Sequence, residues 1–583
     1  MKKLITYTTG LLLSLVLVSC TDFLEKEYDI TLTEDDVFSS EVNTRGFLAN
    51  MYNYQTDGFL GFHNGQFLGS FRDAMTDNAV SYWNVHYYHG VQTDSYDATN
   101  NPFLNTYWRD NFIAIRKANQ FLKNAKKTVI GSALYDRYMA EAKLLRAMFH
   151  FEIIRYFGAT PIIGENEEGI PIVFEISRAE EMNMTRTPPA EALKWVADQC
   201  DQVKNILPFR YPNETEDWGR VSGAVAYALK SRALLYRASE LNNTGNNPSY
   251  WAEAAQAARD FISVNNQQSN PYRLYSTGDP DNDYYECFTI TPMLNYEFIL
   301  CPEPWATTFI NTEMAPCGFA GQITANGRTN PTQNLVDCYE TINGLPIDKD
   351  PTYDPQNPYV NRDPRFSQTI FHHGMMWGDI EQEEYRMVDV SYPNGRDYKE
   401  LHGGTLTGYY CKKYVNKISY KVPSTPIMAF PSYRYGEILL NAAEAVNEAE
   451  GPDAAYQYVN EIRARAGMPA YSGMTQAELR ERIRNERRIE LCFEDHRYFD
   501  ERRWKIFEGQ TMTSEIGKPY YQQYYNLYGV TVTNPNNPHY EYRPADTYPT
   551  RAFVSPKSYL FPLPDADVKR APNLGQNPGW ELN

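Results

Sequence analysis

The chain has 583 residues, of which 42% are hydrophobic and 22% charged, a balance that indicates a globular protein and excludes a disordered one. Its net charge of −18 would repel phosphate backbones, so nucleic acid is not an expected partner. The only long apolar run stands at the N-terminus, which excludes a polytopic membrane protein. Aromatic residues reach 14%, an excess that fills cores and also suits the stacking of sugar rings.

The N-terminus has the features of a bacterial lipoprotein signal peptide. Lys2 and Lys3 precede an apolar stretch at residues 11–18 that is too short to span a bilayer. Residues 17–20 resemble a lipobox, which implies cleavage after residue 19 and lipid on Cys20. We therefore expect residues 1–19 to be removed and the mature protein to be held at the membrane through Cys20. The alternative is ordinary secretion, with Cys20 as a plain cysteine.

Several segments repeat apolar residues three or four positions apart, which predicts helices. These segments are residues 138–157, 221–241, 251–262, 433–449 and 453–466. Gly158 follows the first of them as a C-cap. The other four form two antiparallel pairs in which small residues allow close approach, as in tetratricopeptide arrays.

A further long helix is expected after Thr475, which forms a capping box with Glu478. Opposite charges stand three and four positions apart along residues 484–494 and would support this helix. A solvated, self-paired helix face is the preferred interpretation of these charges, ahead of a catalytic cluster.

Two other stretches, residues 270–430 and 511–583, are rich in Pro, Gly, Asn, Asp and Tyr and show little helical periodicity. They predict loops, short strands and short helices laid over a helical scaffold. Loops on a rigid scaffold are where binding surfaces usually lie.

The remaining cysteines and acidic residues give little sign of a metal or cofactor. Seven cysteines besides Cys20 are widely spaced without a CxxC pair, which argues against a disulfide framework and a zinc site and predicts buried small hydrophobes. Residues 279–283 resemble the opening of a calcium loop, but Tyr284 replaces the required Gly and Ile290 the bidentate Glu. We expect no cofactor and at most an incidental surface calcium.

Motifs spread over nearly the whole chain resemble, in order, those of the SusD/RagB family of outer-membrane lipoproteins. They lie at residues 140–158, 331–337, 343–344, 361–366, 434–445, 486–504, 561–564 and 573–580. Two departures, Asp495 where Gly or Asn is common and Glu501 where Leu is common, imply changes in local packing only.

The resemblance implies a mainly α, SusD-like fold with tetratricopeptide-like helix pairs and a loop-rich, irregular ligand-binding side. Residues 20–583 would form a single domain. Its helical scaffold would cover approximately residues 40–265 and 431–507, with loop-rich inserts at 270–430 and 511–583.

The resemblance also implies a non-catalytic protein anchored by lipid on the extracellular face of the outer membrane. Such a protein captures oligosaccharides and delivers them to a SusC-like, TonB-dependent β-barrel transporter. RagB-like relatives leave open the alternative of a peptide-capturing lipoprotein of a peptide importer. A surface hydrolase is the third and least favoured alternative, because no nucleophile or phosphate-binding motif is present.

A glycan site needs exposed aromatic faces beside groups that pair with hydroxyls. Two clusters and one further ring fit this requirement, with Trp83 expected to be the main stacking ring and core or loop packing the alternative for each. The candidates are Asp73, Asp77, Asn78, Tyr82 and Trp83 in the first cluster, Tyr284, Tyr285 and Trp305 in the second, and Trp377. The net charge favours a neutral polysaccharide or oligosaccharide, although a local basic patch could reverse this.

Overall fold

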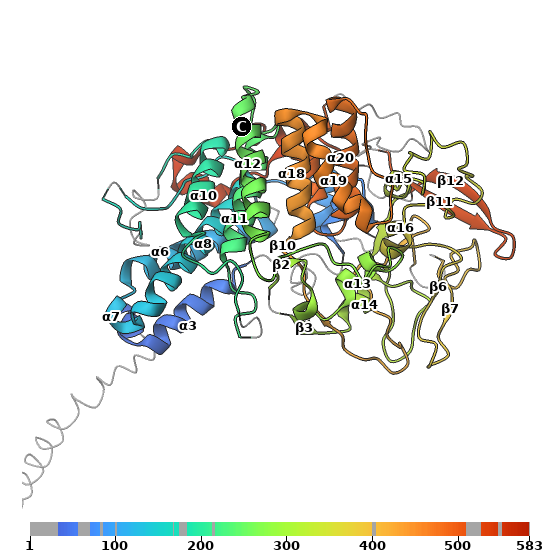
Figure 1. The fold of residues 1–583 in the computed structure, drawn as a ribbon, viewed down its shortest axis with the longest axis horizontal. Coiled ribbons are helices and arrows are strands. Elements are labelled where there is room, and N and C mark those ends of the chain that lie inside the picture. The colour runs from blue at the N-terminus through green and yellow to red at the C-terminus, as the bar shows by residue number, and fades with distance from the viewer. Residues whose placement is uncertain are drawn as a thin grey trace, which may run out of the picture.

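The computed structural model describes residues 33–55, 70–81, 86–99, 102–166, 168–173, 183–212, 216–302, 304–398, 404–508, 526–545 and 551–581. The fold is mainly helical, as predicted, with long helices on one side and short strands and loops on the other (Figure 1). None of the described helices combines the length and the apolar composition needed to cross a bilayer.

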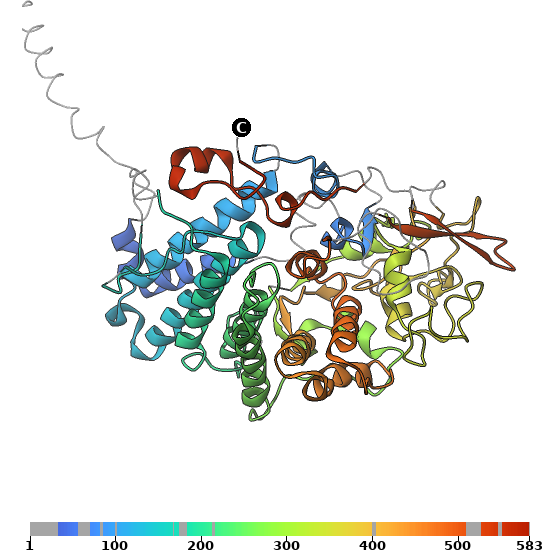
Figure 2. The same cartoon turned by 90° about the horizontal axis from the view of Figure 1, so that it is seen from above.

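The long helices pack as a row of neighbours in the order α6, α8, α10, α11, α12, α18, with α19 and α20 against α18 (Figures 1 and 2). Helices α12 and α18 are adjacent although the whole middle of the chain separates them in sequence. The long helices of this scaffold are α3 (Glu41–Tyr52), α6 (Pro102–Asn124), α8 (Ser132–Phe157), α10 (Pro189–Val203), α11 (Gly223–Ala238), α12 (Pro248–Asn265), α18 (Tyr435–Glu450), α19 (Pro452–Arg465) and α20 (Gln476–Glu490).

Shorter helices fill the loops and the chain ends. They are α2 (Glu34–Ser39), α5 (His86–Gln92), α7 (Lys127–Ile130), α13 (Asp283–Thr289), α14 (Phe309–Met314), α15 (Gln333–Cys338), α16 (Arg365–Thr369), α21 (Arg497–Arg503) and α22 (Asp565–Arg570), with 3-10 turns η1 (Arg72–Met75), η2 (Pro292–Leu294), η3 (Lys557–Tyr559) and η4 (Pro572–Leu574).

The strands form two-stranded antiparallel ladders rather than one sheet. The pairs are β1 (Ala79–Ser81) with β4 (Thr329–Pro331), β2 (Phe298–Leu300) with β10 (Tyr433–Arg434), β3 (Trp305–Ala306) with β9 (Ile427–Met428), β5 (Ile370–Phe371) with β8 (Tyr410–Cys411), β6 (Met376–Trp377) with β7 (Arg386–Met387), and β11 (Tyr528–Thr533) with β12 (His539–Pro544). Most of these ladders join segments far apart in sequence, so they pin the loops to one another.

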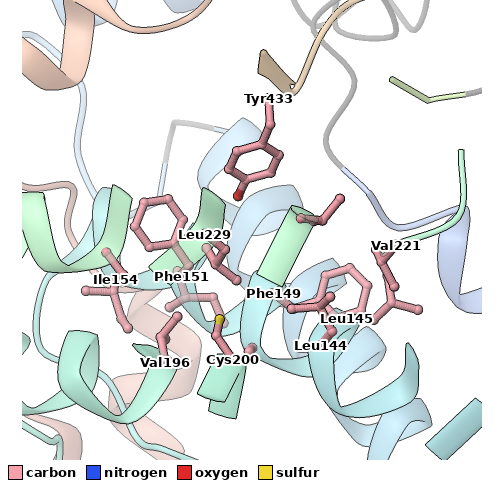
Figure 3. Packing of buried hydrophobic residues seen from close by; sticks show 14 of the residues in the cluster. Leu144, Leu145, Phe149, Phe151, Ile154, Val196, Cys200, Val221, Leu229 and Tyr433 are labelled. Carbon is pink, nitrogen blue, oxygen red and sulfur yellow. The ribbon is translucent and has the colours of Figure 1, made fainter. Parts of the chain in front are cut away.

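The helical periodicity places apolar side chains in clusters that neighbouring helices share, and the first of these clusters includes residues of α6, α8, α10 and α11. Phe149 and Phe151 of α8 lie in this cluster beside Cys200 of α10 and Leu229 of α11 (Figure 3). Gly223 allows the start of α11 to approach the end of α10 closely, since a Cβ at this position would stand 2.6 Å from the carbonyl oxygen of Lys204. All seven cysteines of the described chain are buried and free, so their prediction as small hydrophobes is confirmed.

The C-terminal end of helix α8 is completed from the other end of the chain. Gly158 caps α8 with a φ of 70°, which confirms the predicted C-cap. The Nδ2 of Asn577 then donates to the carbonyl oxygens of Phe157, at 2.8 Å, and Phe561, at 2.7 Å, while its Oδ1 accepts from Arg186 Nη1 at 2.5 Å. These bonds supply a partner to a helix-end carbonyl that would otherwise lack one.

The capping box of Thr475 and Glu478 is confirmed, but the solvated face predicted for residues 484–494 is wrong. Glu486 and Glu490 are fully buried and paired with arginines: Arg365 Nη1 lies 2.6 Å from Glu486 Oε1 and 2.9 Å from Glu490 Oε2. We call this buried charged cluster the ionic core. Its members are Glu297, Glu340, Arg365, Lys413, Arg434, Arg463, Arg465, Glu486, Glu490 and Glu494.

Candidate functional site

The first predicted cluster divides into a buried part and a part that the structure does not describe. Tyr82 and Trp83 lie outside the described residues, between Ser81 of β1 and His86 of α5. Asp73, Asp77 and Asn78 are at most 1% exposed. The prediction that these three residues are exposed for contact with a glycan is therefore wrong.

Hydrogen bonds to the C-terminal helical region explain the burial of this part. Arg497 donates to both carboxylate oxygens of Asp77 at 2.8 Å, and Arg488 Nε donates to Asn78 Oδ1 at 2.7 Å. Burial would raise the pKa of Asp77, but Arg488 and Arg497 hold this pKa well below its usual value. Burial raises the pKa of Asp73 to about 6, although hydrogen bonds from Asn78 and the Phe493 amide act to lower this pKa. These hydrogen bonds join β1 and η1 to helices α20 and α21, and the groups that form them are buried.

The second cluster and the separate ring of Trp377 are also largely internal. Tyr284 and Trp377 are 1% and 2% exposed, so their predicted role as exposed stacking rings is wrong. Lys413 Nζ donates to the hydroxyl of Tyr284 at 2.7 Å, which ties this ring to the ionic core. Tyr285 is half-buried, and its hydroxyl donates to the Val415 carbonyl at 2.8 Å. Trp305 opens strand β3 opposite Met428, but its side chain lies outside the described residues.

A shallow pocket opens beside the β2 ladder strand, at the loop that joins α10 to α11; we call it the Trp218 pocket. The half-buried indole of Trp218 donates from Nε1 to the Pro302 carbonyl at 3.1 Å. Two guanidinium groups and a carboxylate line the same pocket, from Arg210, Arg220 and Asp217. The chain runs from its lining residue Cys301 to Trp305 within four positions.

The polar groups of the Trp218 pocket are held in place by neighbours. Arg210 lies over the ring of Tyr272, with its Cζ 4.6 Å from the ring centroid. Arg220 pairs with Asp217 at 3.3 Å, and its Nη1 with Glu141 at 2.9 Å. An indole with fixed hydrogen-bonding groups matches the apolar face and the hydroxyls of a sugar ring. Trp218 is not among the site residues predicted from the sequence, although an aromatic ring in a Gly- and Asp-containing turn between helices was a usable signal.

A second pocket lies beside β10 and is lined by helix α8 and by the turn at Glu494, Asp495 and His496. Its lining residue Phe149 belongs to the apolar core below it, as does Tyr433 (Figure 3). Burial lowers the pKa of His496 well below its usual value, so this imidazole is neutral. Glu494 is already paired with Lys413 and Arg434. The other two carboxylates that line this pocket are paired as well, Glu152 with Arg155 and Asp495 with Arg72.

The described residues contain no group of three or more His, Cys, Asp or Glu side chains arranged to hold a metal ion. Within the segment that resembles a calcium loop, Asp279 accepts from the amide of Asp281 and from Asn282 Nδ2, at 3.2 and 2.7 Å. Asp283 accepts from Thr277 Oγ1 at 2.8 Å. These carboxylates therefore organise their own turn.

Comparison with known proteins gives a consistent result. Residues 305–580 match the family model described as the SusD family, and residues 22–235 match one described as "Starch-binding associating with outer membrane". SusD-like protein P2 of Formosa agariphila is 25% identical over 82% of this chain and 81% of its own length.

Solved structures share the fold. A SusD-like protein from Bacteroides fragilis has a TM-score of 0.74 and 24% identity, covering 94% of this chain and 98% of its own. A SusD-like carbohydrate-binding protein of the same species has a TM-score of 0.66 and 24% identity, over 92% and 99%. Surface glycan-binding protein A from Bacteroides uniformis has a TM-score of 0.58 and 19% identity, over 92% and 99%. With its paired helices, its loop-rich face and matches to two SusD-type models in succession, the chain belongs to the SusD family.

Proposed function

We propose that this protein captures oligosaccharides at the outer face of the outer membrane and delivers them, uncut, to a SusC-like TonB-dependent transporter. The family description of starch binding in association with the outer membrane supports this role. The observation that carries it is the Trp218 pocket, where an indole lies beside Arg210, Arg220 and Asp217. Tyr82, Trp83 and Trp305 stay predicted as further stacking rings of the same function.

The binding step is tested by affinity electrophoresis and calorimetry of the mature chain across a panel of polysaccharides and oligosaccharides. Trp218→Ala should weaken binding of the preferred glycan about tenfold, because the sugar loses its apolar platform. Trp83→Ala should weaken it likewise. Tyr385→Ala is the matched control, since this ring is 47% exposed and does not line the pocket. Binding of peptides but of no glycan would favour the RagB-like alternative.

The delivery step requires attachment to the membrane and contact with the transporter. We expect the lipid on Cys20 to provide the attachment, so Cys20→Ser should move the protein out of the outer-membrane fraction. A tagged wild-type chain should bring a β-barrel transporter with it from detergent-solubilised outer membranes. Incubation with the preferred glycan should produce no new reducing ends. New reducing ends, or purification without a barrel, would contradict the proposal.

A further inference from the structure

One segment of this acidic chain carries only positive charge. Residues 401–436 contain no Asp or Glu, in a protein with a net charge of −18. Two of its basic side chains, Lys413 and Arg434, are buried and paired with Glu494 in the ionic core. The other three lysines of the segment are nearer the surface: Lys412 is half-buried, and Lys417 and Lys421 are exposed.

Two of these lysines share the same pair of aromatic rings. Lys412 Nζ lies 5.1 Å from the ring centroid of Tyr285 and 5.2 Å from that of Trp377. Lys417 Nζ lies 5.9 and 5.8 Å from the same two centroids. The rings stand edge to face, with centroids 6.0 Å apart. Both ammonium groups are therefore confined to one small region.

Nothing described in the protein neutralises this pair. Among the described residues, no carboxylate forms an ion pair with Lys412 or Lys417, and Lys412 Nζ donates to the Ser367 carbonyl at 2.7 Å. Burial, and then the charge of Lys417, lower the pKa of Lys412 to about 7. Lys417 is exposed and Lys412 half-buried, so the region can be reached from solvent.

We propose that Lys412 and Lys417 form a binding site for an anionic substituent, a carboxylate or a sulfate, on the captured glycan. An anion between the two ammonium groups would satisfy both and remove their mutual repulsion. The half-buried ring of Tyr285 lies beside them and offers an apolar surface to the sugar ring that carries the anion. The proposal rests on the proposed function and replaces the neutral glycan, expected from net charge alone, with a charged one.

Calorimetry of the mature chain with matched glycans tests the proposal. Oligogalacturonate is compared with its methyl ester, and a sulfated galactan oligosaccharide with its desulfated form. The wild type should bind the anionic member of at least one pair more tightly. Lys417→Gln should weaken that binding about tenfold and reduce its salt dependence, while leaving the neutral member unchanged.

Lys421→Gln is the matched control, because Lys421 is an exposed lysine of the same segment whose Nζ donates to the Gln382 carbonyl at 2.9 Å. Equal affinity for charged and neutral members, or equal weakening of both by Lys417→Gln, would overturn the anion site and leave glycan capture standing. Failure to bind any glycan would overturn both. Preference for an acidic peptide over every glycan would assign the lysines to a protein partner and reject the proposal.

A second measurement does not depend on the choice of glycan. Inorganic sulfate should protect Lys412 and Lys417 from acetylation by an amine-reactive reagent, while Lys421 is modified at an unchanged rate. The rates are read by mass spectrometry of the digested full chain. If sulfate leaves the acetylation rates of Lys412 and Lys417 unchanged, as it does that of Lys421, the anion site is contradicted.

Discussion

Arg434 illustrates how single charges are stabilised inside this protein. Its Nη1 lies 2.6 Å from Glu297 Oε1 and 2.9 Å from Glu490 Oε1, and its Nε lies 2.6 Å from Glu494 Oε2. Burial would raise the pKa of Glu490, but Arg465, Arg434 and Arg365 hold it well below its usual value. Removing one partner from such a cluster leaves the others charged and without compensation.

Arg434→Ala should therefore destabilise the protein by about 3–5 kcal/mol, measured as the free energy of unfolding in urea. The matched control is Arg259→Ala, which removes a partly exposed pair with Glu450 and should cost less than about 1 kcal/mol. Similar losses in the two variants would show that the ionic core contributes no more than a surface pair.

Glu501 is a buried carboxyl that should make stability depend on pH. Its Oε1 accepts from the Asp77 amide at 3.2 Å, and burial, followed by the charge of Asp77, raises the pKa of Glu501 to about 8. The folded state therefore binds a proton that the unfolded state has released above its ordinary pKa of about 4.5.

This contribution of Glu501 to stability is complete below about pH 4.5 and is lost as pH rises to about 8. Glu501→Gln keeps the neutral form at every pH. The free energy of unfolding of the wild type relative to this variant should fall between pH 5 and 8, by at most ~1.4 kcal/mol per pH unit, and level off above pH 8. A difference that is constant from pH 5 to 9 would contradict the raised pKa.

Residue-scale expectations from sequence were the least successful, for a physical reason. Asp77 and Trp377 have the residue types of a sugar site, but exposure depends on partners distant in sequence. Asp77 pairs with Arg497, 420 positions away, and the pairing is invisible to any local pattern. Glu501 was expected to change only local packing, yet it introduces a buried titrating group.

At the scale of elements, helix α20 combines a correct and an incorrect prediction. Its start follows from local chemistry: Thr475 Oγ1 accepts from the Glu478 amide at 3.3 Å, and Glu478 Oε2 accepts from the Thr475 amide at 2.8 Å. The burial of α20 does not follow from local chemistry. A charged helix face has the same sequence pattern whether water or buried opposite charges surround it. Helices with apolar periodicity, such as α8 and α18, were correctly predicted because burial of their stripe needs no particular partner.

Thr475→Ala should destabilise the protein by about 1 kcal/mol, because the first turn of α20 loses its side-chain acceptor. Thr475→Ser, which keeps the acceptor, should restore most of the loss. Thermal unfolding followed by circular dichroism measures both. Equal stability of the alanine and serine variants would contradict the capping role.

At the scale of the whole molecule, the ionic core joins parts that the sequence analysis treated as scaffold and insert. Glu297 and Arg365 lie in the loop-rich stretch between α12 and α18, while Glu486 and Glu490 lie on α20. Strand β2 of the same stretch pairs with β10 directly before α18. The division into scaffold and inserts stays a prediction. The loop-rich stretch has an apolar cluster and strand pairs of its own, but its buried charges and strand β2 have their partners outside it.

A fragment of residues 270–430, expressed alone, should therefore show no cooperative thermal transition, because its buried charges and β2 would lack their partners. The mature full chain should unfold in a sharp transition under the same conditions. Circular dichroism and intrinsic fluorescence measure both. A sharp transition of the fragment would identify an autonomous folding unit.

The hydrogen bonds of Asn577 have a consequence for the time course of biosynthesis. The carbonyl of Phe157 receives its partner from a residue 420 positions later. A ribosome adding ~5–20 residues per second needs about 20–80 s to cover that interval. During this delay the carbonyl of Phe157 at the C-terminal end of helix α8 lacks this hydrogen-bond donor. The early half of the polypeptide thus reaches its final form only after nearly all of the message has been translated.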